Sequence, residues 1–224
     1  MKNPHPLLIA IDGPAGAGKT TVSKMLAQDL GYRYLDTGAL YRGVAYEVHA
    51  AGVAEDDDAG LERVCQTLQL EFRDSRLISN GVDISGRIRT PEITMLASTV
   101  SARPVVRQAL LDLQRSLGRA KALVAEGRDM GTVVFPDADL KFFLDASVRQ
   151  RALRRYEQYG EAREQTLARI EHEIRQRDAN DSSRDVAPLK PADDAVTIDS
   201  TAMDARQVVA KMMAHVAALG FAQK

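Results

Sequence analysis

Short apolar runs and amphipathic stretches alternate along most of the chain. Five runs have the length and composition of buried strands, and they occupy residues 7–11, 32–35, 122–125, 140–144 and 195–198. Helical patterns separate most of them, and apolar residues three and four positions apart predict helices over 20–30 and about 204–219. Strands that alternate with helices are typical of parallel sheets covered by helices. The pattern therefore predicts a three-layer α/β fold.

A long excursion separates the second and third predicted strands. It has helical patterns over 41–70, broken by the acidic turn "AEDDDAG", and over 91–117, interrupted before Pro104. Between them, "LEFRDSRLISNGVDIS" contains short strand patterns with turn signals at Asp74-Ser75 and Asn80-Gly81. A crossover between parallel strands needs only a helix, so we predict an inserted subdomain with its own small antiparallel sheet. A second, shorter insertion is expected at 156–164.

The first strand leads into a glycine-rich loop that ends in lysine and threonine. Gly13, Gly18, Lys19 and Thr20 fit the spacing G-x-x-x-x-G-K-[ST], with a strand before the loop and a helix after it, as this motif requires. Such a loop points backbone N–H groups inward, and the helix N-terminus adds partial positive charge. We expect it to bind a nucleoside triphosphate; the alternative is a glycine-rich connector with an incidental lysine. The predicted phosphate contacts are Gly13, Pro14, Ala15, Gly16, Ala17, Gly18, Lys19, Thr20 and Thr21.

The composition is that of an ordinary globular protein. Of the 224 residues, 45% are hydrophobic and 27% are charged, and the formal net charge of −1 gives no reason to expect nucleic acid or a membrane as a partner. No apolar run is long enough to span a bilayer, and the N-terminal run is too short for a signal peptide. The single cysteine, Cys65, excludes an intramolecular disulfide, and its apolar helical context favours a packed thiol. We expect a cytoplasmic protein.

Charged residues follow two of the predicted strands, at the ends that line the ligand crevice of an α/β sheet. Arg128 and Asp129 follow the third strand between glycines, so we expect them to face the same crevice as the phosphate-binding loop. The alternative for this pair is an exposed ion pair in a turn. After the second strand, Asp36 or Thr37 is a candidate N-cap for the next helix, and Arg42 in its first turns can aim at the crevice.

Arginines are concentrated between residues 149 and 184. Arg177, Asp181 and Arg184 fall on one face of a helix, if the helix continues that far. For these residues we favour contact with a ligand, because "DANDSSRD" is poor helix sequence to keep only for exposed ion pairs. Three more arginines on the preceding helix leave ligand contact and ion pairs with nearby glutamates equally open, namely Arg151, Arg154 and Arg155.

The loop motif predicts one ligand for Mg²⁺. Within such a motif the lysine, here Lys19, reaches the terminal phosphates, and the hydroxyl of Thr20 binds the metal. A carboxylate partner is harder to assign, because Asp36, Asp145 and Asp199 all end strand-like runs, although Asp145 in "KFFLDA" fits best. The four histidines are scattered without metal-ligand spacing.

Six segments together resemble one family. They are "IDGPAGAGKTT", "YLDTGALYR", "VAEGRDMGTVVFPDA", "KFFLDAS", "RDANDSSRDVAPL" and "IDST", and they span nearly the whole chain. In these segments the chain resembles the bacterial cytidylate kinases, nucleoside monophosphate kinases of the P-loop class. The resemblance implies a single kinase domain over 1–224 that transfers the γ-phosphoryl group of ATP to CMP or dCMP, with Mg²⁺ as cofactor. It also implies that the insert, about 40–117, binds the monophosphate, and that a short mobile lid lies at about 154–170.

The resemblance further implies individual roles for residues that match the family's motifs. Thr37 belongs to the CMP-binding set and stands where serine is also common, which keeps the hydroxyl. The segment 178–184 is richer in serine and asparagine than the family's version, but it loses no expected functional group. The implied cytosine contacts are Ser98, Arg107 and Asp129; the sugar contacts are Arg177 and Asp181; the monophosphate contacts are Arg42, Arg128 and Arg184; the catalytic residues are Lys19, Arg128 and Arg184; and the lid candidates are Arg151, Arg154 and Arg155.

Other functions remain compatible with parts of this sequence. A kinase of the same fold that acts on another nucleoside monophosphate or on a small hydroxy acid is the nearest alternative. A nucleotide-dependent switch is a second, although the guanine-reading N-K-x-D motif is absent from the sequence. Nucleic-acid-handling P-loop proteins are disfavoured by the nearly neutral charge. We expect ATP and CMP or dCMP as the partners, and a monomer without an obligate protein partner.

Overall fold

Strand β1 (Leu8–Asp12) is the central strand of a parallel five-stranded sheet with the order β2-β6-β1-β7-β8. It pairs in parallel with β6 and with β7, and Ile9 lies opposite Val124 and Leu140. All five residues of β1 are buried, as its continuous apolar run predicts. The other strands are β2 (Arg33–Asp36), β6 (Leu123–Glu126), β7 (Leu140–Asp145) and β8 (Val196–Asp199).

The computed structural model describes residues 5–73, 76–158 and 166–220. Within it the chain divides into two compact units. The first, called the core unit below, comprises Met1–Leu35 and Gly118–Lys224 and holds nearly all of the parallel sheet. The second, called the insert unit, comprises Asp36–Leu117.

Helices α1 (Lys19–Leu30) and α8 (Ala205–Ala218) pack against each other and against the sheet of the core unit. Apolar residues of both helices and of the sheet form one hydrophobic cluster. It includes Leu26, Met212 and Phe142, which are fully buried. The apolar face predicted for the last helix, which includes Met212 and Met213, therefore packs in the core. Both helices begin and end within one residue of the predicted bounds.

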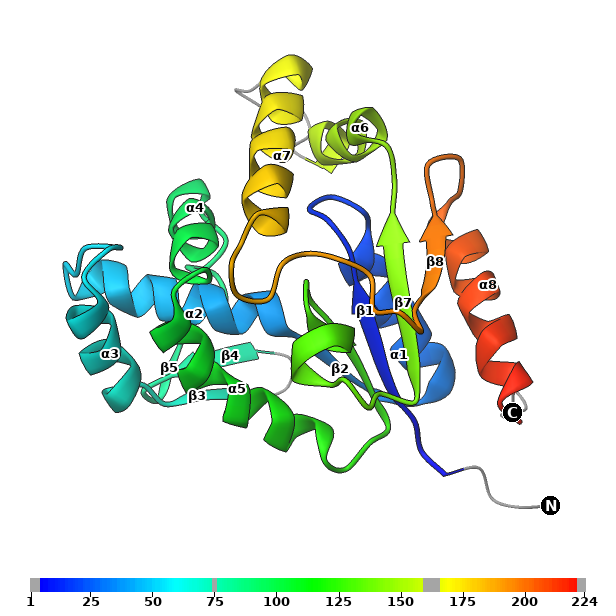
Figure 1. Ribbon diagram of the computed structural model, residues 1–224, viewed down its shortest axis with the longest axis horizontal. Helices are drawn as coiled ribbons and strands as arrows, with labels where there is room; N and C mark the ends of the chain where they lie inside the picture. The colour runs from blue at the N-terminus through cyan, green and yellow to red at the C-terminus, as the bar shows by residue number, and fades with distance from the viewer. Residues whose placement is uncertain (1–4, 74–75, 159–165, 221–224) are drawn as a thin grey trace. The chain divides into compact units, whose positions relative to one another are not determined.

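The remaining helices of the core unit lie near the carboxyl ends of the strands. In Figure 1, α6 (Val148–Gln158) follows the arrowhead of β7, and α7 (Leu167–Ser182) packs beside it around Ile170 and Ile174. A short π-helix, η1 (Met130–Val134), follows β6 and was not expected from the sequence. The condition set for a common helix face is met for Arg177 and Asp181 but not for Arg184, because α7 ends at Ser182.

The insert unit has a hydrophobic core of its own around Leu40, Leu61 and Val100. Its three-stranded antiparallel sheet, β3-β4-β5, confirms the small sheet predicted from the sequence. Asn80 and Gly81 form the predicted turn with positive φ angles of 48° and 82°, whereas Asp74-Ser75 lies outside the described residues. Its elements are α2 (Thr37–Ala50), α3 (Asp58–Thr67), β3 (Leu70–Arg73), β4 (Arg76–Ser79), β5 (Val82–Asp83), α4 (Pro91–Val100) and α5 (Pro104–Gly118).

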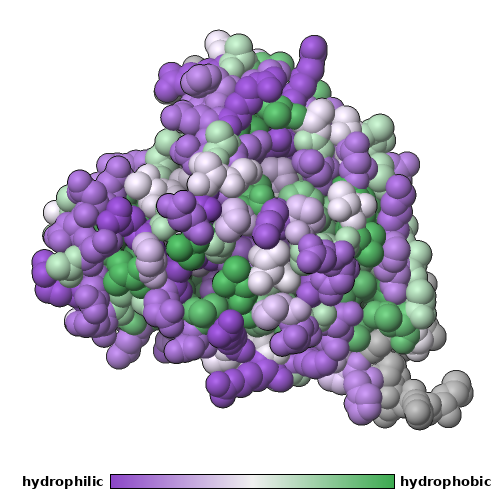
Figure 2. All heavy atoms as spheres, viewed as in Figure 1, coloured by the Kyte–Doolittle hydropathy of each residue, from purple (hydrophilic) through white to green (hydrophobic). Residues whose placement is uncertain are grey.

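Two further expectations concern the apolar residues of the chain. Cys65 is half-buried in the hydrophobic cluster of the insert unit, and burial raises the pKa of its thiol, which favours the packed role. None of the helices in the described ranges combines the length and the apolarity that a bilayer crossing needs. On the face drawn in Figure 2, hydrophobic residues form small groups among hydrophilic ones.

Candidate active site

The loop between β1 and α1 packs tightly against β7 and Arg151. A Cβ atom at Gly13 would lie 2.0 Å from the carbonyl oxygen of Leu144 in β7, so only glycine fits there. Gly16 has a φ of +77°, and a Cβ on it would lie 3.1 Å from the Cβ of Arg151. These two glycines let the loop turn tightly over the end of the sheet, where a helix N-terminus follows at Lys19.

Lys19 is buried inside this loop with only 7% of its surface exposed. Its Nζ donates to the carbonyl oxygens of Gly13 and Pro14, at 2.6 and 2.7 Å. Burial lowers the pKa of Lys19 well below its usual range, and the nearby charges of Arg128 and Arg177 lower it further. A polyanionic ligand at the loop would offset this repulsion, so the site favours phosphate groups.

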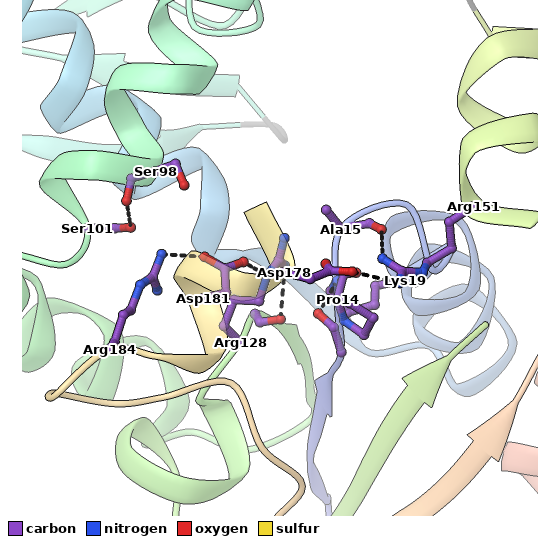
Figure 3. Close-up of polar contacts among 12 residues, drawn as sticks. Pro14, Ala15, Lys19, Ser98, Ser101, Arg128, Arg151, Asp178, Asp181 and Arg184 are labelled. Carbon is purple, nitrogen blue, oxygen red and sulfur yellow. Dashed lines mark hydrogen bonds and ion pairs between the residues drawn. The ribbon is translucent and has the colours of Figure 1, made fainter. Parts of the chain in front are cut away.

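Arginines of the core unit meet on one buried carboxylate. Asp181, only 1% exposed on α7, accepts a hydrogen bond from Nε of Arg128 at 2.8 Å and pairs with Arg184 two residues beyond the helix end (Figure 3). Burial acts to raise the pKa of Asp181, but the charges of Arg128, Arg184 and Arg177 outweigh it and hold the pKa below its usual value. The structure thus brings together the predicted residues of the arginine-rich segment and Arg128.

Asp129 lies beside this cluster in sequence and is also buried, with 2% of its surface exposed. It precedes η1, and its carbonyl oxygen accepts the N–H groups of Val133 and Val134 at 2.9 and 3.1 Å. The alternative that Arg128 and Asp129 form an exposed turn ion pair does not fit, because Arg128 pairs with Asp181 and Asp129 is inaccessible to water.

The start of α2 in the insert unit carries two of the predicted CMP-binding residues, Thr37 and Arg42. The side chain of Asp36 accepts the N–H of Ala39 at 3.0 Å and so caps the helix, as expected. Arg42 pairs with the same carboxylate at 3.0 Å, and Arg89 approaches it at 3.5 Å. Thr37 is buried at the first position of the helix. Two guanidinium groups thus converge on the carboxylate that caps the start of α2.

The other predicted insert residues are held by local contacts. Arg107, 8% exposed on α5, donates from Nη1 to the carbonyl oxygen of Ser101 at 3.1 Å. Its guanidinium lies 5.5 Å from the ring centroid of Tyr41, which is within the range of a cation–π contact. Ser101 in turn donates its hydroxyl to the carbonyl oxygen of Ser98 at 3.0 Å. These contacts fix the orientation of Arg107 before any ligand binds.

The arginines named as lid candidates make contacts that the sequence did not reveal. Arg151 is 4% exposed and bonds the carbonyl oxygens of Ala146 and Ala15, at 2.8 and 3.0 Å, and the carboxylate of Asp178 at 2.7 Å (Figure 3). Arg154 donates to the carbonyl oxygens of Ala17 and Ser200, at 3.3 and 2.6 Å.

In this state Arg151 and Arg154 therefore tie the phosphate-binding loop to its surroundings. Ion pairing with the glutamates of their own segment is not what holds them. Arg155 is half-buried on the same helix. Residues 159–165 of the predicted lid lie outside the described residues, and contact between these arginines and ATP stays a prediction.

The last residue of β1, Asp12, is a buried acid that was not predicted as a site residue from the sequence. Both carboxylate oxygens of Asp12, 3% exposed, accept backbone N–H groups of η1, from Met130 at 2.8 Å and from Gly131 at 2.7 Å. A charged residue that ends an otherwise apolar strand directly before the glycine-rich loop is the signal that would have identified it. Its partners are 118 and 119 residues away and could not be read from local pattern.

Comparison with known proteins settles the family. The model of the cytidylate kinase family matches residues 9–218. The chain belongs to the cytidylate kinase family. It is 50% identical over 211 residues to a cytidylate kinase of Geobacter sp. (strain M21), covering 92% of this chain and 91% of the relative. It is 49% identical over 216 residues to the cytidylate kinase of Syntrophotalea carbinolica, covering 94% and 92%.

Solved structures extend the likeness at the level of the fold. A shikimate kinase from Acinetobacter baumannii, in complex with shikimate, matches with a TM-score of 0.50 at 18% identity, covering 95% of this chain and 94% of that one. At this identity the match shows the fold alone. The match and the parallel sheet confirm the α/β fold predicted from the sequence, with kinases among its structural neighbours.

Proposed function

We propose that the residues around Lys19 and Asp181 carry the reaction of the family, transfer of the γ-phosphoryl group of ATP to CMP or dCMP. One observation supports this assignment above the others. The charges of Arg128 and Arg177 act on the donor-side lysine and on the buried acid of α7 alike. A loop for the triphosphate and a cluster for a second anion are therefore close enough to share their cations, as a two-phosphate reaction requires.

The transfer itself needs alignment and charge neutralisation more than covalent help. A phosphate oxygen of CMP forms the new bond to the γ-phosphorus, the bond to the bridging β–γ oxygen breaks, and ADP leaves with that electron pair. Lys19 would bind the β- and γ-phosphates in place of the carbonyl oxygens of its own loop. Arg128 and Arg184 would bind the acceptor phosphate, since the arginine fork matches phosphate oxygens. Arg42 of the insert unit is proposed as a further contact of that phosphate.

Mg²⁺ is the proposed cofactor, and the residues present fit it. The described residues contain no group of three or more histidine, cysteine, aspartate or glutamate side chains that would form an all-protein metal cage. That agrees with Mg²⁺, which keeps several waters and binds through few protein groups plus substrate phosphates. Thr20, in the first turn of α1, is the proposed ligand, and the ion would neutralise charge on the triphosphate. Asp145, Asp36 and Asp199 each hold a local backbone N–H, so none stands out as the second ligand.

The monophosphate is proposed to be read through three side chains. Cytosine presents an amino donor at N4 and an acceptor at N3, whereas uracil presents an acceptor and a donor there. An ionised Asp129 only accepts, and Arg107 only donates, so both match cytosine and oppose uracil. Ser98 can rotate its hydroxyl and discriminates least. The sugar is assigned to Arg177 and Asp181.

Replacement of one carboxylate oxygen of Asp129 by an amino group tests whether this residue recognises the base. Asp129→Asn keeps the shape but supplies an amide that can donate to O4 of uracil. We expect the ratio of kcat/KM for CMP to that for UMP to fall by about ten- to a hundredfold, because each buried unpaired polar group costs about 1–3 kcal/mol. The matched control is Asp193→Asn, an exposed residue of the same unit, whose ratio should stay at the wild-type value. A ratio that is equal in wild type and Asp129→Asn would remove Asp129 from base recognition.

Formation of CDP tests the reaction as a whole. Chromatography of a mixture of ATP, Mg²⁺ and CMP should show CDP and ADP in equal amounts, and omission of CMP should suppress ADP release. A cytoplasmic location and a monomeric state remain predictions from the sequence. They do not enter the chemistry proposed for these residues.

A further inference from the structure

Asp12 joins two loops that carry different parts of the proposed site. It directly precedes Gly13, the first residue of the phosphate-binding loop. Its two oxygens hold the N–H groups of Met130 and Gly131, at 2.8 and 2.7 Å, and these residues directly follow Arg128 and Asp129. One carboxylate therefore fixes the turn of the acceptor-side residues against the start of the donor-side loop.

The two N–H groups belong to the first turn of η1, where a helix has no partners for them within itself. Asp129, which precedes that helix, supplies no side-chain cap. Asp12 supplies the cap instead, from a strand more than a hundred residues away in the sequence. The approach is close: a Cβ on Gly131 would lie 3.4 Å from Oδ2 of Asp12 and 3.1 Å from Cδ of Lys141.

The surroundings of Asp12 set the pH range in which the carboxylate is charged. Burial raises the pKa of Asp12 to about 6, and the charge of Asp129 adds to the rise, whereas the two N–H groups and Lys19 act to lower it. Lys141 of β7 lies against Gly131 and pairs with Asp194 at 2.8 Å. At neutral pH the carboxylate is ionised and both oxygens can accept.

We propose that Asp12 is a positioning residue for phosphoryl transfer, which holds the Arg128-Asp129 turn at a fixed distance from the phosphate-binding loop. It touches neither substrate and acts only through the backbone of these two loops. The inference rests on the proposed roles of Lys19, Arg128 and Asp129. A displacement of about 1 Å between reacting groups can lower a rate about a hundredfold, so the effect should appear in turnover more than in ATP binding.

Two substitutions separate this role from a structural one. Asp12→Ala removes both acceptors, and we expect kcat with CMP to fall about a hundredfold. Asp12→Asn keeps one carbonyl oxygen but turns an amino group toward the second N–H, and we expect a loss of roughly tenfold. The affinity of the free enzyme for ATP should change by less than about threefold in both, because the phosphate-binding groups themselves are intact.

Asp139 offers a matched control at the opposite end of the same strand. Its carboxylate also accepts a backbone N–H of β1, from Leu8 at 2.7 Å, but it contacts neither functional loop through that bond. Asp139→Ala therefore removes a comparable bond from β1, and Asp139→Asn, like Asp12→Asn, keeps one acceptor oxygen. We expect kcat of these variants to stay within about threefold of wild type, even where Tm falls.

The dependence on pH gives a second readout. Protonation of Asp12 costs the wild-type enzyme an acceptor. The ratio of wild-type to Asp12→Asn activity should therefore be largest near pH ~8, about two units above the pKa, and approach one near pH ~5, about a unit below it. The ratio cancels the titration of the CMP phosphate itself, which occurs near pH ~6. Stability should move in the opposite sense. The pKa is raised on folding from 3.8 to about 6, so ionisation of Asp12 opposes folding as pH rises through this interval. Tm of Asp12→Asn relative to wild type should therefore rise between pH ~4 and ~6 and stay at its highest value above that range.

An activity loss that is greatest where the relative stability is highest supports positioning. The proposal is overturned if the Asp12 variants lose no more kcat than the Asp139 variants, or if their loss follows the fall in Tm at every pH. A wild-type enzyme that forms no CDP would instead overturn the proposed function. If the wild-type enzyme forms CDP and the Asp12 variants have the same kcat as wild type, only the positioning role is overturned.

Discussion

Lys19→Ala is expected to lower kcat with CMP by at least about 10²- to 10³-fold, because it removes a preorganised cation from the transferring phosphate. The ammonium is held within the loop by the carbonyl oxygens of Gly13 and Pro14, and it is 7% exposed. Burial and two arginines lower its pKa, and the charges of Glu126 and Asp12 offset this only in part. The phosphates of a bound triphosphate would stabilise the charged ammonium further. Initial-rate kinetics at saturating ATP measure the loss.

Two controls give that loss its meaning. Lys211→Ala changes an exposed lysine on α8 and should leave kcat unchanged. Thermal unfolding should show that Lys19→Ala is folded, and it should not be destabilised, because a buried charge under repulsion is removed. Turnover of Lys19→Ala near that of wild type would contradict the assigned role of the loop in catalysis.

Arg128→Ala is expected to lower kcat/KM for CMP by about 10³-fold, the lower part of the range observed for arginines that stabilise transferring phosphoryl groups. The guanidinium is aimed by its bond to the buried Asp181 and lies close enough to Lys19 to lower its pKa. ATP binding to the free enzyme should not weaken. Arg128→Lys should recover little of the loss, because an ammonium cannot present the two parallel donors of a guanidinium.

An arginine elsewhere in the core unit controls for the loss of a cation. Arg169 lies on α7 in an exposed ion pair with Glu173 at 3.3 Å, and Arg169→Ala should leave kcat/KM unchanged, as exposed pairs contribute little. Isothermal titration with ATP and with CMP separates the two binding sides. If Arg128→Ala weakens ATP as strongly as CMP, Arg128 belongs to the donor side and not to the acceptor side.

Most elements of the fold could be predicted from the periodicity of apolar residues and from the residue types in the turns. The apolar runs located each strand of the parallel sheet within two residues. The signal is plainest in β1 and β6, which are buried throughout, because a strand buried on both faces reads as a continuous apolar run. The Asn80-Gly81 turn and the break before Pro104 are local signals and were also found where predicted. η1 was missed because a segment of five residues, one of them a glycine, is too short to show a helical period.

Candidate site residues were predictable where a motif fixed them, and less so where long-range packing did. The motif of the glycine-rich loop predicted Lys19 as a site residue. The segments that resemble the family implied the arginines that the structure places around Asp181. The contacts of Arg151 with Ala15 and Asp178, and those of Asp12 with η1, join segments far apart in the chain. Local patterns in a single sequence do not indicate which distant segments will come into contact. The ligand roles themselves stay predictions until they are measured.

The most direct test of the account is a screen of phosphoryl acceptors with the purified enzyme, ATP and Mg²⁺. ADP release is measured in parallel with CMP, dCMP, UMP, AMP, GMP and shikimate, and without any acceptor. We expect rapid release with CMP or dCMP and almost none with AMP, GMP or shikimate. Release with UMP should be slower by at least about tenfold, as expected for a site that pairs with the cytosine edge. Equal release with and without acceptor, or a preference for any acceptor other than a cytidine monophosphate, would contradict it.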